Sequence, residues 1–144
     1  MKINRVLKID GTLLDQQQLN SHLEKIASSH NLTNKSDKKT YPIPNMMENY
    51  KFIAQVYELL NEHLKLGISI HPAGEWLLDN FYIIEQTVKQ IQKELPIKKY
   101  KNFVGISNGK YKGFARIYVL AAEIVAYTDN KIEKKELEEC LEAY

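Results

Sequence analysis

Apolar residues recur at intervals of three and four along most of this chain, which is the spacing that places them on one face of a helix. The first such run is Leu19, Leu23, Ile26 and His30. Asp15 precedes it, and an aspartate side chain at that point can accept a hydrogen bond from the first helical turn. The pattern therefore predicts an amphipathic helix that begins after Asp15 and ends near residue 31.

The next region predicts a linker followed by a long helix. Residues 31–45 contain few apolar side chains, and Pro42 and Pro44 would each remove a hydrogen bond from a helix interior. From about Met46 to Leu66, apolar and polar residues alternate again with helical spacing. Gly67 follows, where a left-handed residue is expected to end the helix.

A second long helix is expected to begin at Pro72, because proline suits the first helical turn. Its apolar positions are close to a heptad seam, so we expect it to pack at a shallow angle on a neighbouring helix. The seam residues are Leu77, Phe81, Ile84, Val88, Ile91 and Leu95. Pro96 ends the pattern.

The remaining third predicts a loop and two helices. Residues 97–113 hold three glycines among polar side chains and are interpreted as a loop. Residues 114–127 form the most apolar stretch and are rich in alanine, which favours a largely buried helix. After a turn at 128–130, the apolar spacing of residues 132–144 predicts a final helix. It reaches Tyr144 without a cap, so we expect the chain to be a piece of a much larger protein.

These elements predict an all-α protein, a single helical bundle of about five helices with a short N-terminal arm. We expect residues 1–45 to form the arm, a short helix and the linker, and residues 46–144 to form the core of one domain. In the arm, Val6, Leu7 and Ile9 are expected to be extended.

Composition narrows the function without identifying it. The 144 residues include 20 Lys+Arg and 18 Asp+Glu, so the net charge is only +2 and a nucleic-acid partner is not expected. One cysteine allows neither an internal disulfide nor a cysteine metal site, and the four histidines show no ligand spacing, so we expect no metal and no cofactor. No apolar stretch approaches the roughly 20 residues of a membrane span, so no direct membrane insertion is expected.

Four charged residues are candidates for chemistry or for internal pairing. Glu75 and Asp79 are four residues apart and share one helix face, as paired carboxylates of a glycoside-active enzyme could. Arg116 and Glu123 lie within the apolar helix, where buried charges need partners. We favour an internal ion-pair cluster, in which Arg116 pairs with Glu75 or Asp79, over catalysis.

Aromatic residues keep a carbohydrate-binding surface open as an alternative. Aromatic rings can stack on sugars, although at helical spacing they more often belong to a core. The candidates are Trp76, Phe81, Tyr82, Phe114, Tyr118 and Tyr127.

Two blocks of sequence resemble a known family. Residues 70–85 read IHPAGEWLLDNFYIIE, and residues 113–129 read GFARIYVLAAEIVAYTD. Both are similar, in order and separation, to segments near the start of bacterial cyclic β-1,2-glucan synthases, beginning with their PA-x-EWLLDN motif. The resemblance is good over residues 67–144, fair over 40–66 and nearly absent before that. Tyr127 stands where relatives often carry histidine.

The resemblance implies a place in a very large inner-membrane protein. Synthases of this family build β-1,2-glucan from UDP-glucose and trim it with a phosphorylase-like region, but the motifs of those active sites have no counterpart here. The chain is therefore interpreted as a non-catalytic N-terminal accessory domain on the cytoplasmic side of the inner membrane, which docks on the rest of its polypeptide. The candidate residues for the polar cluster and the docking surface are Glu75, Trp76, Asp79, Arg116, Tyr118 and Glu123. The alternatives are a module that binds nascent β-glucan and a glycoside-active enzyme.

Overall fold

The computed structural model describes residue 9 and residues 11–144, and these residues form two compact units. Unit 1 comprises the described residues up to Tyr41 together with Ile97–Tyr144, and unit 2 comprises Pro42–Pro96. The extended segment expected at Val6 and Leu7 lies outside the described residues. The predicted division of the chain into residues 1–45, as arm, short helix and linker, and residues 46–144, as the core of one domain, stays a prediction.

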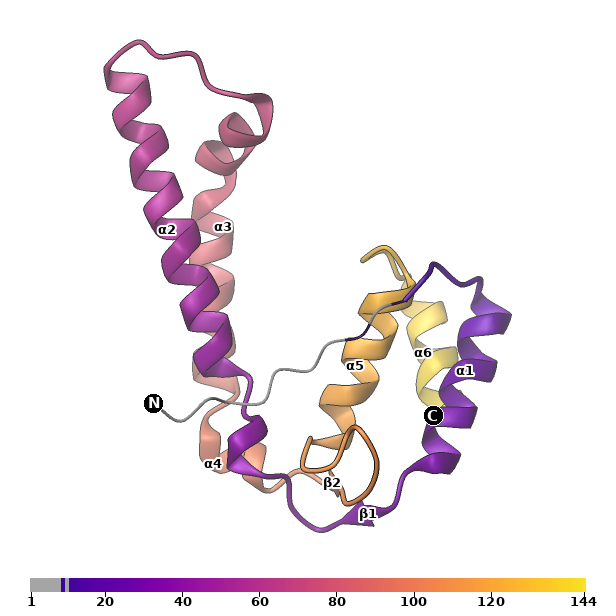
Figure 1. The fold of residues 1–144 in the computed structure, drawn as a ribbon. Coiled ribbons are helices and arrows are strands. Elements are labelled where there is room, and N and C mark those ends of the chain that lie inside the picture. The colour runs from indigo at the N-terminus through magenta and orange to yellow at the C-terminus, as the bar shows by residue number, and fades with distance from the viewer. Residues whose placement is uncertain (1–8, 10) are drawn as a thin grey trace. The chain divides into compact units, whose positions relative to one another are not determined.

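Unit 1 combines helices with a minimal sheet (Figure 1). Its elements are α1 (Gln16–Ser29), β1 (Leu32–Thr33), the 3-10 helix η1 (Lys38–Thr40), α4 (Ile97–Lys101), β2 (Gly105–Ile106), α5 (Arg116–Tyr127) and α6 (Lys134–Ala143). The predicted Asp15 cap is confirmed: its side chain accepts a hydrogen bond from the Gln18 amide at 2.8 Å, and the Gln18 side chain accepts one from the Asp15 amide. This reciprocal pair fixes the start of α1.

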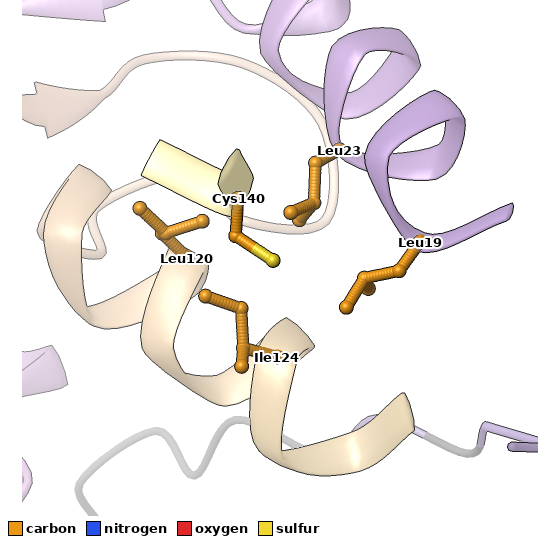
Figure 2. Close-up of a cluster of buried hydrophobic side chains, with 5 residues drawn as sticks. All are labelled: Leu19, Leu23, Leu120, Ile124 and Cys140. Atoms are coloured by element: carbon orange, nitrogen blue, oxygen red, sulfur yellow. The ribbon is translucent and has the colours of Figure 1, made fainter. Parts of the chain in front are cut away.

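The main core of unit 1 lies where α1, α5 and α6 meet. Figure 2 shows side chains from the three helices converging there. Leu19 and Leu23 of α1 pack with Leu120 and Ile124 of α5 and with Cys140 of α6, all of them buried. The helical spacing of α1 predicted this apolar face correctly. The packing also explains why α1 belongs to the same unit as the end of the chain.

A second core cluster of unit 1 lies beside the sheet. Ile106, Tyr111, Phe114 and Val119 are buried together there. β1 and β2 are antiparallel, with Leu32 opposite Ile106. The strands have two residues each, and their pairing brings the chain after α1 against the segment that leads into α5.

Unit 2 is a helical hairpin of α2 (Ile43–Lys65) and α3 (Pro72–Glu94), which lie side by side (Figure 1). The rings of Tyr57 and Phe81 stack across the hairpin with centroids 4.1 Å apart. Gly67 ends α2 as predicted, with φ of +69° and the Ile68 amide donating to the His63 carbonyl. The first turn of α3 is capped by His71, whose Nδ1 accepts from the Ala73 amide at 3.2 Å.

The structure confirms the all-α class and corrects two of the predicted elements. α2 begins at Ile43 rather than Met46, because Pro44 falls in the first turn, where its missing amide hydrogen costs nothing. Residues 97–113 are not simply a loop, since they contain α4 and β2. Both elements are too short for periodicity to reveal, and α4 brings the α-helices of the described residues to six.

Candidate functional site

The structure divides the predicted site residues between the two units. Glu75, Trp76 and Asp79 lie on α3 in unit 2, whereas Arg116, Tyr118 and Glu123 lie on α5 in unit 1. An ion pair of Arg116 with Glu75 or Asp79 would join the two units, and it stays a prediction. Within unit 1, Arg116 and Glu123 have partners that the sequence did not indicate.

Glu123 is the centre of a buried polar cluster in unit 1. Its side chain is 0% exposed, and its two carboxylate oxygens have different partners. Oε1 accepts a hydrogen bond from the Tyr111 hydroxyl, and Oε2 lies 2.8 Å from Nε2 of His22 on α1. The His22 ring also packs edge-on against Tyr127, with centroids 4.6 Å apart. The cluster therefore satisfies a carboxylate in the apolar face of α5 and connects α5 to α1.

Arg116 contacts the end of α6. Its Nη2 donates to the Tyr144 carbonyl oxygen at 2.8 Å, and its guanidinium lies 4.7 Å from the centre of the Tyr144 ring. The Tyr144 hydroxyl is in turn 3.0 Å from Nδ1 of His30. A cation at the carbonyl end of a helix is electrostatically favourable, so this contact stabilises the packing of α6 on α5.

Burial lowers the pKa of His30 below its ordinary value of 6.5, and the positive charge of Arg116 lowers it further. The folded chain then binds fewer protons here than the unfolded chain. The contribution of His30 to stability is complete above about pH 6.5 and is lost as the pH falls below it. We expect His30→Gln to make the urea midpoint fall less than in the wild type between about pH 7.5 and pH 5.5.

The control for this prediction is Ser28→Gln, an exposed position of the same helix, where the same side chain is introduced and every titratable group is kept. We expect Ser28→Gln to follow the wild-type pH dependence. Equal pH dependence of the His30→Gln and wild-type midpoints would show that His30 does not titrate differently on folding.

Tyr118 packs against the second core cluster of unit 1. It is half-buried, and its ring stacks on buried Phe114 with a centroid separation of 6.2 Å. Burial raises the pKa of its hydroxyl. The prediction that Tyr118 belongs to the polar cluster or the docking surface remains untested.

An open apolar hollow of about 560 Å³ lies in unit 1 beside Arg116. Leu32, Ile117 and Leu141 line it together with Tyr144, and these three aliphatic side chains are each about half exposed. Neither Glu75 nor Asp79 lines this hollow. Its lining can contact apolar groups, but it brings no pair of carboxylates together for acid–base chemistry.

The hairpin of unit 2 carries an exposed apolar surface on each helix. Phe52 and Leu59 of α2 are 67% and 52% exposed, and Trp76 and Ile83 of α3 are 61% and 46% exposed. We call these four residues the hairpin face. The sequence predicted Trp76 as a docking candidate but did not identify the other three.

The contacts between α2 and α3 place these residues in two pairs, each at one height along the hairpin. Tyr57 stacks on Phe81, and the Leu60 side chain lies beside Gly74, so Leu59 is level with Trp76. The contact of Tyr50 with Glu85, together with the Tyr57–Phe81 stack, places Phe52 level with Ile83 in the same way.

Helix geometry places both pairs on one side of the hairpin. Each exposed residue follows a contact residue by two positions, about 200° around its helix. Phe52 follows Tyr50, and Trp76 follows Gly74. The residue three positions after each of these contact residues is also half-buried, as Ile53 and Leu77 are, so the contact surface of each helix extends in that direction. The exposed residues therefore lie to one side of the contact surface and not directly opposite it. Because the helices are antiparallel, an equal rotation on both brings all four residues to the same side.

Residue 9 and residues 11–144 contain no group of three or more His, Cys, Asp or Glu side chains positioned to hold a metal ion. Within them, no helix is both long enough and apolar enough to cross a bilayer.

Comparison with known proteins confirms the resemblance seen in the sequence. Over 98 residues, which are 67% of the chain, it is 30% identical to the cyclic β-(1,2)-glucan synthase NdvB of Rhizobium meliloti (strain 1021). The similarity supports a relationship to the N-terminal region of that synthase. The matched segment spans only 3% of the length of the synthase. No family model and no solved structure matches the chain.

Proposed function

From the relationship to a cyclic β-(1,2)-glucan synthase, we propose that this chain is a non-catalytic helical docking domain of a synthase-like glycosyltransferase. Its task is to bind another part of the polypeptide that carries the glucan-forming site. The hairpin face is the observation that supports this proposal, because Trp76 and Leu59 expose large apolar surfaces at one level of unit 2. Exposed apolar surface of this kind is typical of protein contacts.

The same relationship supports a location for the domain. We propose that it lies with its parent protein on the cytoplasmic side of the bacterial inner membrane. Docking would then hold the domain beside the catalytic part of the synthase, where it could position that part or its primer.

The position of the carboxylates favours docking over catalysis. Glu75 and Asp79 are both exposed on α3, and neither of them lines the hollow of unit 1. Glycoside cleavage needs two carboxyl groups that flank one bond in a site that also binds the sugar ring. Docking needs neither feature.

The arrangement of the aromatic rings gives less support to binding of β-glucan. Phe81 stacks on Tyr57, and Phe114 is 1% exposed, so neither offers a free ring face to a sugar. Trp76 and Tyr82 are well exposed, but they are six positions apart, about 120° around the helix, so they point to different sides of α3. A platform of coplanar rings therefore does not form on this helix.

The proposed function is tested in the Rhizobium meliloti synthase. We expect removal of its matched segment to reduce the cyclic β-(1,2)-glucan extracted from cells about tenfold or more, because the remaining parts would lose a docking contact. Replacement of that segment by residues 11–144 of this chain should restore synthesis. Glucan is measured per amount of synthase protein, so that poor expression is not counted as lost activity.

The matched control is the same chimera with Glu75→Gln, because Glu75 is exposed on α3 but is not part of the hairpin face. A docking domain should tolerate this substitution, and glucan should stay within about twofold of the unsubstituted chimera. Loss of synthesis in this control, at an unchanged level of protein, would indicate catalysis. Normal synthesis after removal of the segment would contradict an accessory role.

A further inference from the structure

Unit 2 has too little internal packing for two helices of 23 residues each. Ile43 and Val88 are its buried residues, although it comprises 55 residues from Pro42 to Pro96. Helices in proteins obtain most of their stability from packing of an apolar face, and a two-helix hairpin covers only one face of each helix. The hairpin face is a second apolar surface that a third element could cover.

The charges bordering the hairpin face have one sign. The residues one turn away on its outer side are Glu48, Gln55, Glu62, Asp79 and Gln86. Glu48, Glu62 and Asp79 are exposed and form no ion pair within the described residues. By helical spacing the four lysines of the two helices lie farther from the face than these residues do: Lys51, Lys65, Lys89 and Lys93. The border of the face is therefore acidic, in a chain with a net charge of +2.

Between the two apolar ridges, the polar groups of α3 are already hydrogen bonded. The Asn80 side-chain amide donates to the Trp76 carbonyl at 2.8 Å, and the Thr87 hydroxyl donates to the Ile83 carbonyl at 2.8 Å. Covering these groups therefore leaves the Thr87 hydroxyl and one Asn80 N–H satisfied, which lowers the cost of burying this strip under a partner.

We propose that the hairpin face binds an amphipathic α-helix whose apolar stripe is bordered by lysine or arginine residues. This inference rests on the proposed function, and it names the partner as a cationic helix elsewhere in the synthase-like polypeptide. The apolar stripe would lie along Phe52, Leu59, Trp76 and Ile83, and its basic border would face the acidic one. A second copy of the chain is a poorer occupant, because two identical acidic borders would then meet.

The inference is tested with model peptides and the full chain. Trp76 is the single tryptophan and lies within the face, so its fluorescence reports on what covers it. The probes are two helical peptides of about five turns with the same leucine stripe, one with lysine and one with glutamate at every polar position. We expect the leucine–lysine peptide to shift the emission of Trp76 to the blue, with binding that weakens as salt rises. The leucine–glutamate peptide should leave the emission unchanged.

Variants identify the surface and the charges. Phe52→Gln combined with Leu59→Gln should weaken binding of the leucine–lysine peptide about tenfold or more, because two large apolar contacts are lost. Tyr82→Gln is the matched control, since Tyr82 is 59% exposed on another side of α3, and it should bind as the wild type does. Glu62→Lys combined with Asp79→Lys should weaken binding of the lysine peptide and allow binding of the glutamate peptide. Circular dichroism checks that each variant stays helical.

Other results would overturn the inference. Equal binding of both peptides would show that the acidic border selects nothing, and an unchanged affinity of the Phe52→Gln/Leu59→Gln variant would place the peptide elsewhere. A blue shift that follows protein concentration without peptide, together with a dimer in light scattering, would identify a second copy as the occupant. If neither peptide binds while glucan synthesis still needs the segment, the docking function stands and this partner is wrong. If the lysine peptide binds while the segment is dispensable, only the docking function fails.

Discussion

Glu123→Ala is expected to lower the free energy of unfolding by about 3 kcal/mol. The substitution removes the acceptor of the Tyr111 hydroxyl, and Tyr111 is only 4% exposed, so its hydroxyl would stay buried without a partner. It also removes the partner of His22, whose side chain is 29% exposed and can turn partly to water. Urea unfolding followed by far-ultraviolet circular dichroism measures the loss. Glu123→Gln keeps an oxygen for Tyr111 and should cost only about 1 kcal/mol.

The control is Glu138→Ala on α6, because Glu138 pairs with Lys134 at the surface at 3.7 Å. An exposed pair of this kind contributes little, so this change should stay within about 0.5 kcal/mol of the wild type. Tyr111→Phe tests the assignment, since its effect should be much smaller when Glu123 is already alanine. A loss below about 0.5 kcal/mol for Glu123→Ala would show that the cluster contributes nothing to the fold.

The periodicity of the sequence identified α1 and α3 well and missed the short elements. Leu19 and Leu23 were predicted on the buried face of α1, and Pro72 was predicted at the start of α3, because helical spacing and caps are local properties. α4 and β2 have five and two residues, too few to show a period. Their formation depends on pairing with distant residues, such as Leu32 opposite Ile106.

The sequence also showed that Glu123 needs a partner, but it could not identify that partner. His22 lies 101 residues away, next to the apolar stripe of α1, where it resembles an ordinary surface residue. Arg116 was predicted to pair with Glu75 or Asp79, and its guanidinium donates to the Tyr144 carbonyl. The choice between such partners depends on how helices are arranged, which is a property of packing and not of local pattern.

The hairpin face was predicted in part for a related reason. The sequence indicated Trp76 and Asp79 as docking candidates through the family resemblance. The heptad seam of α3 included Phe81 and Val88. Ile83 lies outside this seam, so the sequence pattern gave it no predicted role. Only the contacts between α2 and α3 show that Ile83 is level with Phe52. A second apolar stripe on a helix becomes informative once the first stripe has a known partner.

Gly105→Ala is expected to lower the free energy of unfolding by about 3 kcal/mol. A Cβ atom at this position would clash with the Lys35 carbonyl oxygen and would lie 3.0 Å from its carbonyl carbon. Both are backbone atoms, so no side chain can turn aside. β2 would have to move away from the chain that follows β1, although Gly105 pairs with Thr33 and also bridges to Ala115. Urea unfolding by circular dichroism measures the loss, and hydrogen exchange should show faster exchange of the Ile106 amide.

Gly67→Ala is the matched control, because it adds the same methyl group where the backbone has a φ of +69° and nothing lies within 4 Å. Its cost comes from the left-handed conformation alone and should be about 1 kcal/mol. The difference between the two variants therefore measures the steric contact at Lys35. Equal losses for Gly105→Ala and Gly67→Ala would contradict the close approach of the two chain segments, and with it the pairing that joins β1 to β2.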